Sequence, residues 1–120
     1  MFERLGQSCE LISRHAQHLV QRFLDFAHRT EKLRIIGRTE AELDRRVSTV
    51  SFVIEGQDSR EVEAHAVHHN IAVRSGDFYA RRLIDALGLN THHGVVRASM
   101  VHYNTIEEVD RLIACLQEIL

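Results

Sequence analysis

The chain has 120 residues, of which 44% are hydrophobic and 27% are charged, and its formal net charge is −2. These values are ordinary for one soluble globular domain, and the weak negative charge argues against nucleic acid or an anionic membrane as the main partner. No apolar run is long enough to cross a bilayer, and the first ten residues lack the apolar segment of a signal peptide, so the cytoplasm is the expected compartment.

The first half of the chain predicts a long helix followed by two strands. Apolar residues recur at steps of three and four through the first thirty residues, which predicts one amphipathic helix. Its apolar stripe comprises Leu5, Cys9, Ile12, Ala16, Leu19, Phe23 and Ala27. Residues 33–36 and 48–54 are rich in β-branched side chains, which predicts strands, and the charged stretch 38–46 between them predicts a loop or a loose turn.

The second half alternates helices and strands. Asp58 and Thr105 each precede a glutamate by three residues, a capping-box pattern that predicts a helix over 59–69 and a last helix that runs to the C-terminus. Two short strands at 71–74 and 95–101, and a helix capped by Asp77, complete the pattern. The buried face of that helix is predicted to comprise Phe78, Ala80, Leu83, Ile84 and Leu87. The whole predicts a single domain over residues 1–120 of the α/β (α+β) class. Its architecture is a two-layer sandwich with a small three- or four-stranded sheet and helices packed on one face.

Nine histidines raise the question of a metal site. His65, His68 and His69 are spaced i, i+3 and i+4 on one predicted helix, and His15 and His18 are three residues apart on another. Zinc needs three or four converging ligands, and no cysteine pair or HExxH helix accompanies these histidines. We therefore interpret them as polar, solvated helix faces and predict no metal ligands, with a histidine metal site as the weaker alternative.

The two cysteines, Cys9 and Cys115, both occupy apolar positions of predicted helices. We predict that they are buried free thiols, since two distant cysteines do not make a disulfide framework. The sequence contains no nucleophile elbow and no glycine-rich phosphate loop. Local chemistry alone therefore indicates no catalytic centre.

Arg97 interrupts an otherwise apolar predicted strand, Val95–Val101. An unpaired guanidinium is rarely buried because its desolvation is costly. Two interpretations remain open from the residues alone. The arginine lies on an edge strand and points to water, or it is a fork on a rigid strand that binds a carboxylate through two parallel hydrogen bonds.

Three motifs occur in order near the end of the chain: Arg97-Ala98-Ser99, Tyr103-Asn104-Thr105 and Glu107-Glu108-Val109-Asp110-Arg111-Leu112. Together with the stretch from Val47 onward, they resemble the carboxy-terminal small domain of the class V aminotransferase and cysteine desulfurase-like family of fold type I pyridoxal-phosphate enzymes. The resemblance implies that a large domain, absent from this chain, holds pyridoxal phosphate on a lysine. It also implies that Arg97 binds the α-carboxylate of an amino-acid substrate.

Two positions depart from the pattern of this family. Its desulfurases carry a mobile loop of the form R-x-G-H-H-C-A, whose cysteine accepts sulfur, and here Tyr79 stands at the position of that cysteine. The resemblance leaves Tyr79 as a substrate-pocket hydroxyl or as an aromatic that packs the loop. Lys32, the only lysine, lies between the first helix and the first strand, where the family has no Schiff-base lysine. We therefore expect a surface role for Lys32, and neither a catalytic residue nor a bound cofactor in this chain alone.

The resemblance implies a substrate-binding small domain of a pyridoxal-phosphate-dependent desulfurase-like or aminotransferase-like enzyme. Its partner would be the large cofactor-binding domain, and the chain alone would be inactive. The parent reaction would be carbon–sulfur or carbon–selenium lyase chemistry, or transamination. The alternative is a stand-alone interaction module, in which the long first helix forms the seam of a homo-oligomer.

Overall fold

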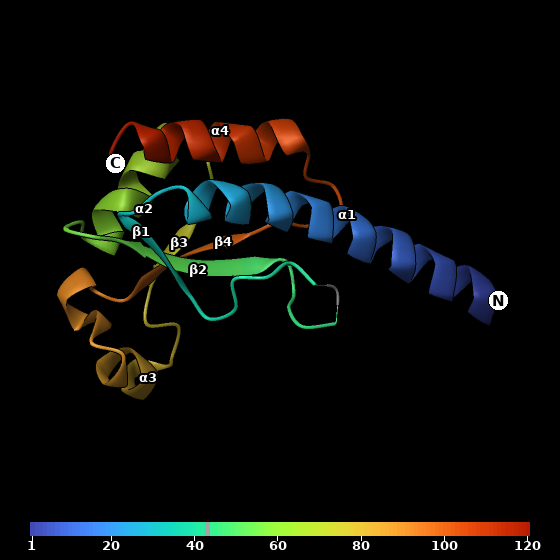
Figure 1. The fold of residues 1–120 in the computed structure, drawn as a ribbon, viewed down its shortest axis with the longest axis horizontal. Coiled ribbons are helices and arrows are strands. Elements are labelled where there is room, and N and C mark those ends of the chain that lie inside the picture. The colour runs from blue at the N-terminus through green and yellow to red at the C-terminus, as the bar shows by residue number, and fades with distance from the viewer. Residues whose placement is uncertain (43) are drawn as a thin grey trace.

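The computed structural model describes residues 1–42 and 44–120, which form an antiparallel sheet with helices on both faces (Figure 1). Residue 43, within the predicted loop 38–46, lies outside the described residues. The strands are arranged in the order β1-β2-β4-β3, and each neighbouring pair is antiparallel. The predicted fold class and order of elements are confirmed. The elements are α1 (Phe2–His28), β1 (Leu33–Ile36), β2 (Thr49–Ile54), α2 (Ser59–His68), β3 (Arg74–Gly76), α3 (Arg81–Ala86), the 3-10 helix η1 (Leu89–His92), β4 (Val95–Ser99) and α4 (Ile106–Gln117).

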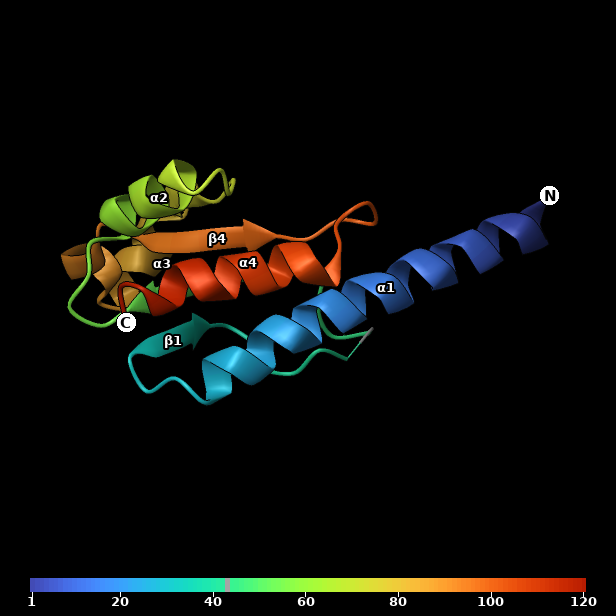
Figure 2. The same ribbon diagram turned by 90° about the horizontal axis from the view of Figure 1, so that it is seen from above.

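The main core lies between the sheet and the three longer helices. Strand alternation turns Val50, Phe52 and Ile54 of β2 toward this layer, where all three are fully buried. Phe23 of α1 packs on Phe52 with their ring centroids 5.4 Å apart. Helices α1 and α4 lie side by side over the sheet (Figures 1 and 2).

The opposite face of the sheet carries a smaller apolar cluster. Val53 and Val95 point away from the main core because each is one residue out of phase with the core-facing positions. Ile84 of α3 and Leu89 of η1 pack on these two valines. The prediction of helices on one face therefore holds for α1, α2 and α4, whereas α3 and η1 cover one end of the other face (Figure 1).

The predicted helix starts are largely correct. Thr105 forms the full capping box with Glu108, and Asp58 accepts a hydrogen bond from the backbone N–H of Arg60 at 2.9 Å. The third helix was predicted to be capped by Asp77, but α3 begins only at Arg81. The third strand also begins later than predicted, because Ile71 still donates its N–H to the Ala66 carbonyl at the end of α2.

Helix α1 extends well beyond the sheet at its N-terminal end (Figure 2). The predicted apolar stripe is buried from Leu19 onward, but Leu5 and Ile12 are exposed. Cys9 is also exposed, so its predicted burial is wrong. The reason is length: 27 residues of α-helix span about 40 Å, while a six-residue strand spans about 20 Å. Among the described residues, no helix combines the length and apolarity needed to span a membrane.

Gly94 joins η1 to β4 at a point where two backbones touch. Its φ is +91°, and a Cβ placed on it would lie 2.2 Å from the carbonyl oxygen of Gly76. Gly76 ends β3, the neighbour of β4. Only glycine therefore fits at position 94, and this contact sets how closely β3 and its following loop approach the start of β4.

We expect Gly94→Ala to lower the free energy of unfolding by about 3 kcal/mol or more, because backbone overlap and a left-handed φ act together. The measurement is urea unfolding followed by circular dichroism. Gly56→Ala is the matched control, since Gly56 has a φ of +76° and no atom of the described residues lies within 4 Å of the added Cβ. It should cost only about 1 kcal/mol. Equal losses in the two variants would contradict the role of the close contact.

Candidate functional site

Arg97 lies on the sheet face opposite the main core. Its strand neighbours in register are Ser51 of β2 and Arg74 of β3, so β4 is an interior strand. The edge-strand interpretation of Arg97 is therefore wrong. The side chain is nevertheless exposed, because α3, η1 and Phe78 leave part of this face open among the described residues. That interpretation is correct only in that the side chain reaches solvent, and the binding of a carboxylate by Arg97 stays a prediction.

The guanidinium of Arg97 is held over an aromatic ring. Its Cζ lies 3.9 Å from the ring centroid of Phe78, a cation–π arrangement. Within the part of the chain that the structure describes, no carboxylate lies within ion-pair distance of Arg97. The ring thus fixes the plane of the fork while its N–H donors stay available to a ligand.

Arg97 and Phe78 border a hollow on this face, which we call the open-face hollow. Its volume is about 620 Å³, within the range of small-molecule sites. It is lined by Arg34, Ile35, Ile36, Gly37, Ser51, Asp77, Phe78, Ala80, Leu83, Ile84, Leu87, Val95 and Arg97. Two arginines outnumber the one carboxylate, Asp77, whose Oδ1 accepts the Tyr79 N–H, and with a serine hydroxyl and a largely apolar wall they suit a small ligand that carries a carboxylate.

The loop after β3 determines which aromatic side chain reaches the hollow. Phe78 and Tyr79 have φ values of 50° and 64°, a left-handed conformation rare for large side chains. Asp77 Oδ1 accepts a hydrogen bond from the Tyr79 N–H at 3.1 Å. Phe78 consequently turns inward under Arg97, whereas Tyr79 is fully exposed. The structure therefore does not bring Tyr79 and Arg97 together, and Tyr79 does not pack the loop.

Phe78 is the residue of this site that the sequence interpretation assigned elsewhere, to the buried face of the third helix. The only signal in the sequence was that Phe78 and Tyr79 are adjacent, since two neighbouring side chains point in different directions and one of the two aromatics was therefore expected to turn inward. The left-handed turn that separates them is not encoded by glycine. No local pattern therefore distinguished the inward aromatic from the outward one.

Glu63 of α2 anchors β3 just before this loop. Its Oε2 accepts hydrogen bonds from the Ser75 hydroxyl and from the Ser75 N–H, the latter at 2.8 Å. Arg74 adds a contact at 3.4 Å to Oε1. The Ser75 hydroxyl, followed by the Ser75 N–H and Arg74, holds the pKa of the Glu63 carboxyl below its ordinary value. This contact ties the short strand β3 to α2.

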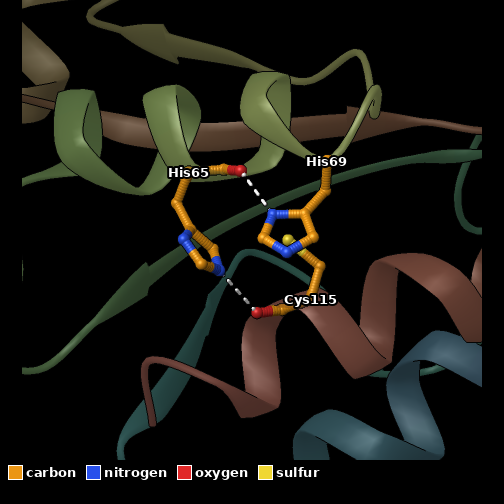
Figure 3. A group of neighbouring side chains, drawn as sticks. All are labelled: His65, His69 and Cys115. Atoms are coloured by element: carbon orange, nitrogen blue, oxygen red, sulfur yellow. Dashed lines mark hydrogen bonds between the residues drawn. The ribbon is translucent and has the colours of Figure 1, made fainter.

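A second cluster of chemically capable side chains lies between α2 and α4, within the helix layer (Figure 3). His65, His69 and Cys115 each offer a metal-binding atom, and these atoms lie within 4.8 Å of one another. His65 and His69 are half-buried, so the polar-face interpretation holds on α2 for His68 and on α1 for His18, which are both exposed. Cys115 is buried as predicted, and burial raises the pKa of its thiol. Sequence spacing could not reveal this cluster, because Cys115 is distant in the chain.

Lys32 is exposed in the turn between α1 and β1, as expected. Ser51 pairs with Ile36 of β1 on one side and with Arg97 of β4 on the other, so these three residues form one row across the sheet. Lys32 precedes β1 and lies four residues, or about 13 Å along the strand direction, from this row. Enzymes that use pyridoxal phosphate hold it as a Schiff base on a lysine. The described residues of this chain do not fit that cofactor, because Lys32 is displaced from Arg97 and the glycines are isolated.

The fold matches one part of larger proteins of known structure. The apo structure of a cysteine desulfurase from Thermococcus onnurineus NA1 matches with a TM-score of 0.81 at 32% identity, over 98% of this chain and 27% of that one. The NifS-like protein from Rickettsia africae, at 20% identity and a TM-score of 0.74, shares the fold over 90% of this chain and 29% of its own.

Comparison of the sequence identifies the family to which the chain belongs. The family model described as aminotransferase class-V matches residues 5–112, so the chain belongs to that family. The aminotransferase-like protein FGM3 of Gibberella zeae is 36% identical over 119 residues, which cover 98% of this chain and 30% of that protein. A probable cysteine desulfurase of Xylella fastidiosa is 34% identical over 78% of this chain and 22% of its own length. The chain thus spans less than a third of these relatives.

The anchor between α2 and β3 yields a prediction on acid stability. Because the pKa of Glu63 is lowered on folding, its contribution is present above the unfolded value of about 4.3 and is lost as the pH falls through the folded value. Glu63→Gln should therefore lower stability at pH 7 and reduce the further loss on acidification. Urea unfolding at pH 7 and at about pH 3 measures both. Glu61→Gln, an exposed change on the same helix, should leave the pH dependence unchanged.

Proposed function

We propose that this chain is the substrate-carboxylate-binding small domain of a pyridoxal-phosphate-dependent enzyme that acts on an amino acid. The family match and the length of its relatives support a domain of a larger enzyme. The single observation that carries the proposal is the Arg97 guanidinium, which lies over Phe78 on an interior strand with its donors available. Such a fork binds a carboxylate with both charge and fixed orientation.

The open-face hollow supports the same assignment. Arg34 of β1 lines the hollow together with Arg97, so two guanidinium groups face one cavity against the single carboxylate of Asp77. The neighbouring Arg74 is engaged by Glu63 and does not line the hollow. The apolar wall from α3 and the strands accommodates the side chain of a small amino acid, while the guanidinium groups receive its carboxylate.

The remaining chemistry belongs to a large domain, on the same polypeptide or on a separate one. When bound there, pyridoxal phosphate stabilises negative charge at the substrate's α-carbon. This chain's part is to hold the carboxylate through Arg97 and to limit water at the site with its apolar wall. A tyrosine cannot form a persulfide, so Tyr79 does not serve as a sulfur acceptor. Its exposed phenol instead offers a hydroxyl to a substrate once the large domain closes over the loop. The isolated chain is inactive.

Carboxylate binding can be tested on the chain by NMR titration. L-Alanine at millimolar concentration should shift the amide signals of Phe78 and Arg97 and the Arg97 side-chain Nε–H signal, and ethylamine, which lacks the carboxylate, should not. Arg97→Lys keeps the charge but loses the fork, so it should weaken binding by about tenfold or more. Arg82→Lys, on the exposed side of α3, is the matched control.

Two results would count against the proposal. One is equal L-alanine affinity in Arg97→Lys and in the unmodified chain. The other is stoichiometric formation, by the chain with free pyridoxal phosphate, of an adduct that borohydride fixes on Lys32. The second result would move the cofactor site onto this chain.

The projecting half of α1 favours a second candidate function, that of an interaction module. Phe2, Leu5 and Ile12 are exposed by 83%, 56% and 46%, which leaves an apolar stripe that the described residues do not cover. A helical stripe of this kind buries its apolar area by pairing with another helix. A second copy of the chain is one occupant, and the large domain of the complete enzyme is the other.

Sedimentation velocity separates these two occupants. If the stripe pairs two copies, the chain should be a dimer at micromolar concentration, and Leu5→Glu with Ile12→Glu should convert it to a monomer. Gln7→Glu and Arg14→Glu, at exposed polar positions of the same helix, should leave the dimer intact. A monomer at every concentration would remove the interaction module and leave the large domain as the occupant.

A further inference from the structure

The cluster between α2 and α4 has the donor set and the geometry of a metal site. His65 and His69 occupy successive turns of α2 on the side that faces α4, and Cys115 comes from the last full turn of α4 (Figure 3). One carboxylate oxygen of Glu118 lies 3.2 Å from His65 Nε2 and 3.0 Å from His69 Nε2. Two imidazoles from α2, a thiol from α4 and the carboxylate of Glu118, the C-cap residue of α4, thus converge.

The orientation of His69 matches that of a metal-bound histidine. Its Nδ1–H donates to the backbone carbonyl of His65 at 2.9 Å, which leaves Nε2 directed at the cluster. Metal-ligating histidines almost always donate their other ring N–H to a carbonyl or carboxylate, and this bond fixes the ring and the tautomer. His65 is held less firmly, since its Nε2 donates to the Cys115 carbonyl at 3.1 Å.

The distances need only small changes to accept an ion. In a tetrahedral zinc site, bond lengths near 2.0–2.1 Å to nitrogen and 2.3 Å to sulfur place the ligand atoms about 3.3–3.6 Å apart. The three ligand atoms here are at most 4.8 Å apart. Side-chain movements of about 1 Å would bring the ligand atoms to the separation of a zinc site. The hydrogen bond from His65 Nε2 to the Cys115 carbonyl would be lost.

We propose that His65, His69 and Cys115 bind one zinc ion between α2 and α4, with the Glu118 carboxylate as the fourth ligand. The thiol proton of Cys115 passes to solvent as the zinc–sulfur bond forms, and no redox step is involved. A mixed set of nitrogen, sulfur and oxygen ligands favours zinc over the hard cations magnesium and calcium. With four protein ligands the site is closed and its role is structural.

Zinc at this site would stabilise the contact between α2 and α4. Helix α2 also carries Glu63, which anchors β3 and the loop that presents Phe78. A metal between α2 and α4 would therefore fix the element that positions the open-face hollow. This role does not depend on whether Arg97 binds an amino acid.

Calorimetric titration of the untagged, 120-residue chain with zinc chloride, under a non-chelating reductant, tests the proposal. We expect one equivalent to bind with micromolar affinity or tighter, magnesium to give no heat, and zinc to raise the unfolding temperature. Cobalt in place of zinc should give a thiolate-to-metal charge-transfer band. Cys115→Ser should abolish that band, and His65→Gln or His69→Gln should weaken zinc binding by about 10- to 100-fold.

The histidine-rich surface demands matched controls. His68→Gln and His18→Gln change exposed histidines outside the cluster, and Cys9→Ser removes the exposed thiol, so all three should bind zinc normally. If Cys115→Ser fails to fold because the residue is buried, the two half-exposed histidine variants decide. The proposal is overturned by the absence of zinc binding, or by binding that His65→Gln and His69→Gln leave unchanged.

Discussion

The alternation of side chains along β4 is the constraint on which the other features depend. Val96 and Ala98 must enter the main core, so Arg97 between them must point to the opposite face. Because β4 lies between β2 and β3, this side chain is held on both sides by paired strands rather than at a frayed edge. A one-residue change in register would bury the guanidinium among Phe52 and Phe23, where its desolvation would be prohibitive.

The two faces of the sheet consequently have different chemistry. The helix layer is closed and apolar, apart from the histidine–cysteine cluster at the contact of α2 with α4. The other face is only partly covered and carries the arginines and hydroxyls of the strands. The loop after β3 connects the two, because its anchor Glu63 belongs to α2 and its aromatic Phe78 belongs to the open face. A change in the packing of α2 against α4 can therefore reach the hollow through Glu63, β3 and the loop that carries Phe78.

The sequence predicted the elements well wherever one local signal sufficed. The capping box at Thr105, the β-branched run of β2 and the fold class were all predictable because each rests on neighbouring residues. The predictions failed where distant contacts decided the outcome. Cys9 continues the stripe of Leu19 but has no sheet beneath it, and Phe78 turns inward through a left-handed turn that no glycine announces. The convergence of Cys115 with two histidines likewise depends on helix packing.

The unsupported half of α1 has a mechanical consequence. From Phe2 to Ala16 it is a rod of about 21 Å that leaves the domain at a fixed angle, set by buried residues such as Leu19 and Phe23. A tilt of about 10° at the root displaces the tip by about 4 Å. A partner bound to the N-terminal end of α1 can therefore reorient the domain: a displacement of a few ångströms at that end corresponds to a rotation of about 10° of the sheet and of the face that carries Arg97.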